Sequence, residues 1–153
     1  MDYIDAKILN REQLIRRLKG FPRPIATTNG AFDILHRGHI YTFLEAAKRG
    51  NLIVGINSDE SVRRYKGNDR PINNQYDRAY MVAALDFVAY ATIFEEDNPI
   101  ELLSIIKPDF HVKSKSGFKG LEREVVETNG GDIVLLEDIE GYSTTNILQA
   151  RNS

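Results

Sequence analysis

Short apolar runs alternate with amphipathic stretches along this chain of 153 residues. The β-rich runs lie at residues 24–28, 52–56, 87–94, 110–112 and 133–136. Between the first two, Ile40, Phe43, Leu44 and Ala47 recur at i, i+3, i+4 and i+7, the spacing of one helix face. Strands that alternate with helices form right-handed βαβ units and a parallel sheet covered on both faces. The pattern therefore predicts an α/β/α sandwich with a five-stranded parallel sheet.

A chain of this length suits one compact domain. We predict a single domain over residues 1–153, with an N-terminal helical extension at 1–23 and a short C-terminal helix and tail at 141–153. Asn10 is the expected N-cap of the first helix, whose apolar side would consist of Leu14, Ile15 and Leu18.

Charge and composition exclude several classes of protein. The formal net charge of −2 gives no global basic field for nucleic acid. The absence of cysteine excludes disulfides, thiolate catalysis and zinc–cysteine sites. The first residues lack the apolar run of a signal peptide, and no stretch approaches the roughly 18 apolar residues of a membrane span. We expect a soluble, cytoplasmic protein with neither a membrane nor a nucleic acid as partner.

The ten residues that follow the first predicted strand of the sheet, 30–39 with the sequence GAFDILHRGH, carry the strongest chemical signal. Ligands of parallel α/β sheets bind at the carboxyl ends of the strands. There, a helix N-terminus and the imidazoles of His36 and His39 can donate hydrogen bonds to phosphate oxygens. Gly30 and Gly38 leave room for a phosphate close to the backbone. The segment therefore predicts a phosphate-binding turn.

Other interpretations of this segment are possible. A His-x-x-His fragment alone is more often two surface histidines or a metal-binding pair, but no third protein ligand is visible beside His36 and His39. Asp33 either orients the turn or assists Mg²⁺, and the turn is favoured because aspartate commonly bonds to backbone groups in turns.

Residues 30–39 resemble the GxFDxxHxGH signature of the cytidylyltransferase-like nucleotidyltransferases. Residues 57–67, NSDESVRRYKG, are similar to the NSDxSVxxxKG segment of the bacterial D-glycero-β-D-manno-heptose 1-phosphate adenylyltransferases. Residues 70–78 resemble their RPxN…R stretch, and residues 141–147 resemble their closing GxSTTxI. The resemblance covers nearly the whole chain. It implies a Rossmann-like domain, a homodimer, and Mg²⁺ carried by the nucleoside triphosphate.

The resemblance also implies roles for individual residues. His36 and His39 would contact the triphosphate and stabilise charge in the transition state, and the backbone at Ala31 and Phe32 would hold the α-phosphate. Asn57 and Asp59 would lie close to the nucleoside. The β- and γ-phosphates would be held by Ser143, Thr144 and Thr145. Positive charge near the phosphates would come from Lys66, Arg70 and Arg78, although a solvated basic face is the usual fate of such clusters.

The sequence departs from the family pattern after the fourth predicted strand. The family has a Val-Lys-Gly-Gly-Asp-Tyr loop, and this chain keeps Lys113 but continues with a basic segment up to Gly120 that contains serines. Lysines and serines are good donors to an anionic acceptor. The resemblance implies heptose 1-phosphate as the leading acceptor, and the altered loop is the reason to test other acceptors.

Three functions follow from these observations. The first is transfer of AMP from ATP to a sugar 1-phosphate of the heptose 1-phosphate type, with release of pyrophosphate. The second is a CTP-dependent cytidylyltransferase that acts on glycerol 3-phosphate or another small phosphorylated metabolite. The third is a non-catalytic nucleotide sensor, since a fold alone does not establish activity.

Overall fold

The computed structural model describes residues 2–139 and shows a six-stranded parallel sheet with helices on both faces. The strands are β1 (Ile8–Leu9), β2 (Ile25–Gly30), β3 (Asn51–Asn57), β4 (Tyr90–Phe94), β5 (Phe110–Ser114) and β6 (Asp132–Leu136). The helices are the short 3-10 helix η1 (Asp5–Lys7), α1 (Arg11–Leu18), α2 (Arg37–Ala47), α3 (Asp59–Lys66), α4 (Gln75–Ala83), α5 (Ile100–Ile106) and α6 (Arg123–Thr128).

The Rossmann-like α/β/α architecture is confirmed, but the predicted number of five strands is wrong. The additional strand is β1, a two-residue segment that pairs in parallel with β4 at the edge of the sheet. The N-terminal segment thus contains helix α1, as predicted, and it also joins the sheet through β1. The predicted C-terminal helix and tail lie outside the described residues.

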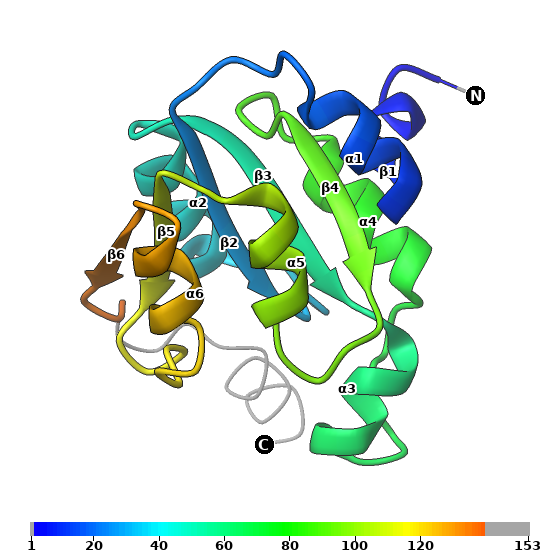
Figure 1. Ribbon diagram of the computed structural model, residues 1–153. Coiled ribbons are helices and arrows are strands. Elements are labelled where there is room, and N and C mark those ends of the chain that lie inside the picture. Colours follow the sequence, from blue (N-terminus) through cyan, green and yellow to red (C-terminus); the bar gives the residue numbers. More distant parts are fainter. Residues whose placement is uncertain (1, 140–153) are drawn as a thin grey trace.

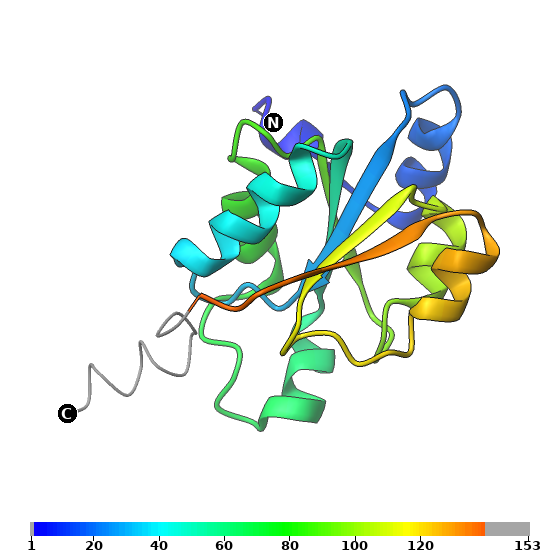
Figure 2. The ribbon, with the colours of Figure 1, turned by 90° about the vertical axis from the view of Figure 1, so that its left-hand side faces the viewer.

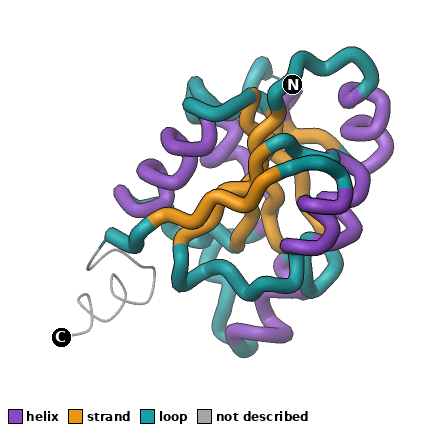
Figure 3. Tube along the Cα trace, turned by 60° about the vertical axis from the view of Figure 1, so that its left-hand side comes forward, coloured by secondary structure: helices purple, strands orange, loops and turns teal. Residues whose placement is uncertain are grey.

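The sheet separates two layers of helices. Helices α2 and α4 cover one face, and α1, α5 and α6 cover the other (Figures 1 and 2). The tube view in Figure 3 shows the same three layers, with α3 beyond the carboxyl ends of the strands. None of the helices between residues 2 and 139 is long and apolar enough to cross a membrane.

The strand order β1-β4-β3-β2-β5-β6 places β2 at the switch in strand order. From β2 the chain proceeds through β3 to β4 on one side, and it then crosses to β5 on the other side of β2. In such sheets the space beyond the carboxyl ends of the strands at the switch is the usual ligand site. Here that space lies beyond Gly30 and Ser114.

Local sequence explains where the helices begin. The Asn10 side chain accepts a hydrogen bond from the Gln13 N–H at 2.8 Å, and the Gln13 side chain accepts one from the Asn10 N–H at 2.9 Å. This reciprocal pair is a capping box, as expected for an asparagine N-cap followed by glutamine at N3. Asn74 caps α4 in a similar way by accepting from the Asp77 N–H at 2.9 Å.

The predicted helix faces are partly confirmed. Leu14 and Phe43 are fully buried, but Ile15 is 44% exposed and Leu44 is 41% exposed. Ile15 and Leu44 each follow a fully buried residue by one position, which turns the side chain about 100° around the helix axis and away from the sheet. Assigning them to the buried face was therefore wrong.

Candidate active site

The turn after β2 is shaped by two unusual backbone positions. Phe32 has a positive φ of 51°, a conformation that L-residues other than glycine rarely adopt. Its ring covers Gly30, where an added Cβ would lie 2.9 Å from the Phe32 Cζ atom. The ring also packs at 5.3 Å, edge to face, on the His39 ring. Gly30 is thus required so that Phe32 can support His39.

The two histidines cap the N-terminus of α2 together. His36 Nδ1 accepts a hydrogen bond from the Gly38 N–H at 3.1 Å, and His39 Nδ1 accepts one from the His36 N–H at 3.3 Å. The rings are stacked with their centroids 3.7 Å apart. Because Nδ1 is the acceptor in each neutral ring, the ring proton is on Nε2. The Gly38 N–H expected to face phosphate therefore bonds to His36, and the His39 Nε2–H is the imidazole donor that the smaller cavity described below can present to a ligand.

Burial keeps these imidazoles neutral. It lowers the pKa of His39 to about 3, and the positive charges of His36 and Lys66 add to the shift. Burial also lowers the pKa of His36. His39 and Lys66 also line the same small cavity, which is described below. At neutral pH both rings are therefore uncharged, and His39 offers a hydrogen-bond donor without positive charge.

Lys66 and Arg70 bring positive charge to the same turn. Burial lowers the pKa of Lys66, and the nearby charge of Arg70 lowers it further. The Arg70 Nη2 atom is buried and has no hydrogen-bond partner within residues 2–139. Its Nε lies 3.4 Å from Asp33 Oδ2, a long contact for a hydrogen bond. A buried guanidinium with an unused donor is a suitable partner for a bound anion.

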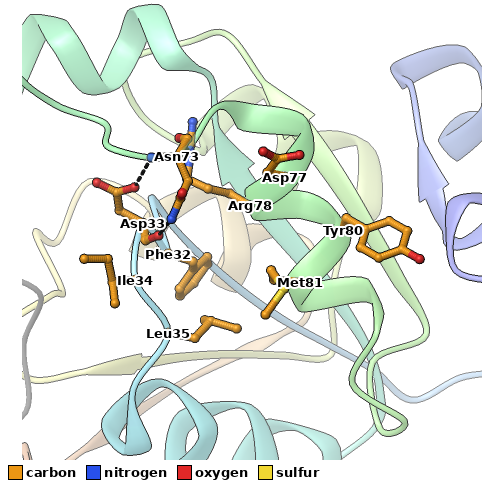
Figure 4. A pocket seen from close by; sticks show the side chains of 9 residues that line it. All are labelled: Phe32, Asp33, Ile34, Leu35, Asn73, Asp77, Arg78, Tyr80 and Met81. Carbon is orange, nitrogen blue, oxygen red and sulfur yellow. Dashed lines mark hydrogen bonds between the residues drawn. The ribbon is translucent and has the colours of Figure 1, made fainter.

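Asp33 ties the turn to the loop that carries these cations. Its carboxylate, in a residue only 4% exposed, accepts hydrogen bonds from the Ile72 N–H at 2.8 Å and the Asn73 N–H at 2.9 Å. The Asn73 side chain donates in return to the Asp33 carbonyl at 2.8 Å. Figure 4 shows Asn73 above Asp33, with dashed lines for the hydrogen bonds between the two residues. Asp33 was expected to bond to the backbone of its own turn, but its carboxylate instead orients the backbone of a loop about 40 residues further along the chain.

Arg78 has a different position from the one the sequence predicts. It is only 1% exposed, and each guanidinium nitrogen donates to a protein oxygen. Nη1 binds the Ala31 carbonyl at 2.7 Å, Nη2 binds Asp59 Oδ1 at 2.8 Å, and Nε binds the Asn73 carbonyl at 2.9 Å. These contacts hold the β2 turn, α3 and the loop before α4 together. Arg78 and Asp59 are therefore occupied with each other, and Asp59 lines neither of the cavities described next.

Two adjoining cavities lie beyond the carboxyl ends of β2 and β5, and they share Asn29, Gly30 and Lys113 in their walls. The smaller cavity, of about 200 Å³, is lined by the β2 turn together with His39, Thr42, Lys66 and Ser114. The larger cavity, of about 540 Å³, is lined by Asn57, Arg64, Tyr65, Asp97, Asn98, Pro99, Gly117, Lys119, Leu121 and Glu122.

Lys113 stands between the two cavities. Its Nζ donates a hydrogen bond to the Asn29 carbonyl at 2.7 Å. Burial lowers the pKa of Lys113 to about 8, against the opposing effect of Glu122. The neighbouring Asn29 Oδ1 is buried without a hydrogen-bond partner in the described part of the chain. The wall between the cavities thus offers one cation and one acceptor.

A third hollow, of about 470 Å³, lies on the α4 side of Asp33 (Figure 4). It is lined by Phe32, Asp33, Ile34, Leu35, Asn73, Asp77, Arg78, Tyr80 and Met81. His39, Lys66 and Lys113 do not line it, so these three predicted catalytic residues lie at the other two cavities.

Two further predictions concern a metal site and the C-terminal phosphate ligands. Residues 2–139 contain no set of three or more His, Asp or Glu side chains that could hold a metal ion. The Asp33 carboxylate is already occupied by N–H donors, which argues against the magnesium role considered for it. Ser143, Thr144 and Thr145 lie outside the described residues.

Sequence reasoning did not assign roles to Asn29, Asn73 or Glu122. Asn29 is a polar residue at the end of a buried strand, which is a signal that could have been used. Asn73 occurs within the RPxN resemblance but received no role. Glu122 shows no signal, because its burial depends on how the loop after β5 folds over the larger cavity.

Comparisons with known proteins agree with this geometry. The cytidylyltransferase-like family model matches residues 27–150. A protein of Nitratiruptor sp. named bifunctional protein HldE is 50% identical over 131 residues, which are 84% of this chain and 28% of the relative. The bifunctional protein HldE of Campylobacter jejuni is 48% identical over 148 residues, 95% of this chain and 31% of the relative. The chain thus spans less than a third of the length of these relatives.

Solved structures show the same architecture. The lipopolysaccharide core biosynthesis protein of Thermoplasma volcanium superposes with a TM-score of 0.66 and 26% identity, over 76% of this chain and 98% of that one. Pantoate-beta-alanine ligase of Francisella tularensis, at 16% identity and a TM-score of 0.61, covers 95% of this chain and 76% of its own, and it shows the fold alone.

Proposed function

The chain belongs to the cytidylyltransferase-like family and is a nucleotidyltransferase, and on that premise we propose that it transfers AMP from ATP to a sugar 1-phosphate of the heptose 1-phosphate type, releasing pyrophosphate. The observation that carries the proposal is the pair of adjoining cavities that share Lys113. One cavity suits a triphosphate and the other suits a second, larger ligand. The resemblance of residues 57–67 and 70–78 to the heptose 1-phosphate adenylyltransferases supports the adenylyl donor and the heptose acceptor.

The smaller cavity is the proposed site of the reacting phosphates of ATP. His39 supplies a neutral N–H donor and Lys66 supplies positive charge in the cavity wall, while Arg70 lies behind the wall beside Asp33 and adds to the positive potential. Donors and cations fixed where negative charge develops stabilise a phosphoryl-transfer transition state. The backbone of Ala31 and Phe32 lies in the wall beside them. Ser143, Thr144 and Thr145 stay predicted ligands of the β- and γ-phosphates.

The larger cavity is the proposed acceptor site. Its volume of about 540 Å³ is ample for a sugar phosphate. Asn57 is 6% exposed and lines this cavity, so we assign it to the acceptor rather than to the nucleoside. Lys113 in the shared wall is placed to contact phosphates in both cavities. Asp33, Asp59 and Arg78 are positioning residues that hold the turn and the cationic loop in place.

The reaction needs no strong base, because the acceptor phosphate is already ionised at neutral pH. An acceptor phosphate oxygen attacks the α-phosphorus and forms a new P–O–P linkage, while the bond to the bridging oxygen of the β-phosphate breaks and pyrophosphate leaves. The chain's contribution is to align the two ligands and to stabilise charge. Nucleotidyltransferases usually use a divalent ion, and we propose that Mg²⁺ arrives bound to the triphosphate. A homodimer also stays a prediction, which light scattering of the purified protein would test.

The test is pyrophosphate release with Mg²⁺, crossing ATP, CTP, GTP and UTP with heptose 1-phosphate, other sugar 1-phosphates and glycerol 3-phosphate. We expect turnover with ATP and the heptose phosphate. His39→Ala should lower kcat about 100- to 1000-fold, the usual cost of one transition-state donor. The matched control is Arg37→Ala, an exposed neighbour at the start of α2, which should keep activity.

Other outcomes of this experiment have clear meanings. Turnover of CTP with glycerol 3-phosphate would establish the cytidylyltransferase alternative instead. Tight nucleotide binding without pyrophosphate release in any combination would contradict the enzymatic proposal and favour the sensor.

A further inference from the structure

The larger cavity contains a buried carboxylate without a hydrogen-bond partner in the described chain. Glu122 precedes α6, lines this cavity and is only 3% exposed. Its side chain neither caps α6 nor forms a hydrogen bond or ion pair with any residue from 2 to 139. Its oxygens are also not among the fully enclosed polar atoms, so the small exposed part includes the carboxylate. The carboxylate therefore opens into the cavity.

Such an arrangement is costly unless a ligand completes it. A buried carboxylate loses most of its hydration, and no hydrogen bond from residues 2–139 replaces what Glu122 has lost. Lys113, which lines the same cavity, interacts with Glu122 electrostatically but donates its hydrogen bond to the Asn29 carbonyl. Asp97, the other carboxylate in the wall, already binds the Arg64 Nε at 2.7 Å. Glu122 is thus the acceptor in this cavity that still needs donors.

The charges of the cavity define the chemistry of its occupant. Lys113 and Lys119 lie in the wall and suit a phosphate, whereas Glu122 would repel a second anionic group. A ligand with a phosphate at one end and neutral donors at the other is the complement of this wall. Hydroxyl groups are such donors, and Asn98 adds an amide that can bind hydroxyls as donor or acceptor.

We propose that Glu122 is a specificity-determining residue that accepts a hydrogen bond from a hydroxyl group of a phosphorylated sugar. This inference rests on the proposed function, because it assigns the larger cavity to the acceptor. It goes further by naming the part of the acceptor that is recognised and the residue that recognises it. Small acceptors that do not reach from Lys113 to Glu122 are selected against, because they leave the carboxylate without a partner.

The test compares Glu122→Gln and Glu122→Ala with the wild type, using the sugar 1-phosphate that the wild type turns over and its monodeoxy analogues. Loss of a hydrogen bond to a charged group should raise the acceptor KM about 10- to 100-fold, with the KM for ATP unchanged. One monodeoxy analogue should have the same kcat/KM with wild type and variants, because it lacks the hydroxyl that Glu122 binds. Glu124→Gln, an exposed carboxylate two residues further on, is the matched control.

Stability separates recognition from a structural role. If Glu122 serves a ligand, Glu122→Gln should melt at the same temperature as the wild type or higher, because it removes an unpartnered buried charge. The inference would be overturned if both variants unfold, or if both keep the acceptor KM of the wild type. It would also be overturned if the KM values for the acceptor and for ATP rise by the same factor.

Calorimetric binding of the sugar 1-phosphate without nucleotide separates this inference from the proposed reaction. Binding that depends on Glu122, without pyrophosphate release, supports the inference and contradicts the reaction. Full turnover by both variants overturns the inference and leaves the reaction standing. A wild type that neither binds nor turns over any sugar phosphate overturns both.

Discussion

Replacing Arg78 by methionine tests whether this arginine holds the site together or contacts phosphate. The sequence favours phosphate contact, whereas the structure buries the guanidinium between three protein oxygens. Methionine keeps much of the buried side-chain volume and removes every donor. The variant therefore loses the contacts to Ala31, Asn73 and Asp59 while the space they enclose stays largely filled.

The size of the effect follows from those contacts. Breaking a buried pair by removing one partner typically costs about 3–5 kcal/mol, because the other groups lose their partner. An unfolding entropy of about 2.1 cal/mol/K per residue gives roughly 0.3 kcal/mol/K for a chain of 153 residues. We therefore expect the melting temperature to fall by about 10–16 °C.

The assay is thermal unfolding followed by circular dichroism, with and without ATP. Arg63→Met is the matched control, since Arg63 is exposed on α3 and its replacement should shift the melting temperature by less than about 2 °C. If Arg78→Met melts within about 3 °C of the wild type but has lost ATP binding, the structural role is refuted and direct phosphate contact is established.

Three further predictions concern protonation and packing. Burial lowers the pKa of His111 to about 3, so the unfolded chain binds a proton below pH 6.5 that the folded chain does not. The free energy of unfolding should therefore be about 2 kcal/mol lower at pH 5 than at pH 8 through this residue, and His111→Phe should remove that part of the difference in urea titrations. Because burial lowers the pKa of Lys113 to about 8, its positive charge is lost as the pH rises through 8. We expect kcat/KM to decline there and the decline to flatten in Lys113→Arg; an identical profile in the variant would assign the decline to another group. Gly30→Ala places a Cβ 2.9 Å from Phe32 Cζ and should cost about 1–3 kcal/mol of stability and lower kcat by moving His39. An unchanged kcat would show that Phe32 does not support His39.

Sequence periodicity predicted the strands and helices that are long enough to show it. It missed β1 because two residues, Ile8 and Leu9, cannot display an alternation. It also assigned Ile15 and Leu44 to buried faces, since apolar character alone does not show where the edge of a buried stripe falls. These errors concern features that are set by packing against the sheet rather than by local preference.

The site shows a similar division. The turn at residues 30–39 is local, so residue types and spacing placed His36 and His39 at the start of a helix, but they did not show that the two rings stack and cap that helix. The partners of Asp33 and Arg78 lie up to 47 positions away along the chain. No local sequence pattern therefore distinguishes an arginine that binds phosphate from a buried arginine that binds other parts of the protein. Glu122 was missed for the same reason, because only the folded loop reveals a carboxylate enclosed without donors.

The position of Lys113 in the wall of both cavities has a thermodynamic consequence. An anion bound in either cavity favours the protonated amine, so binding near pH 8 should take up about half a proton from the buffer. The measured heat of binding will then vary with the ionisation enthalpy of the buffer. Once the first ligand holds the amine protonated, the second ligand meets a full positive charge, which improves its affinity at that pH by a factor of about two. Linkage makes this effect reciprocal, so donor and acceptor promote each other's binding through one shared proton, whichever enters first.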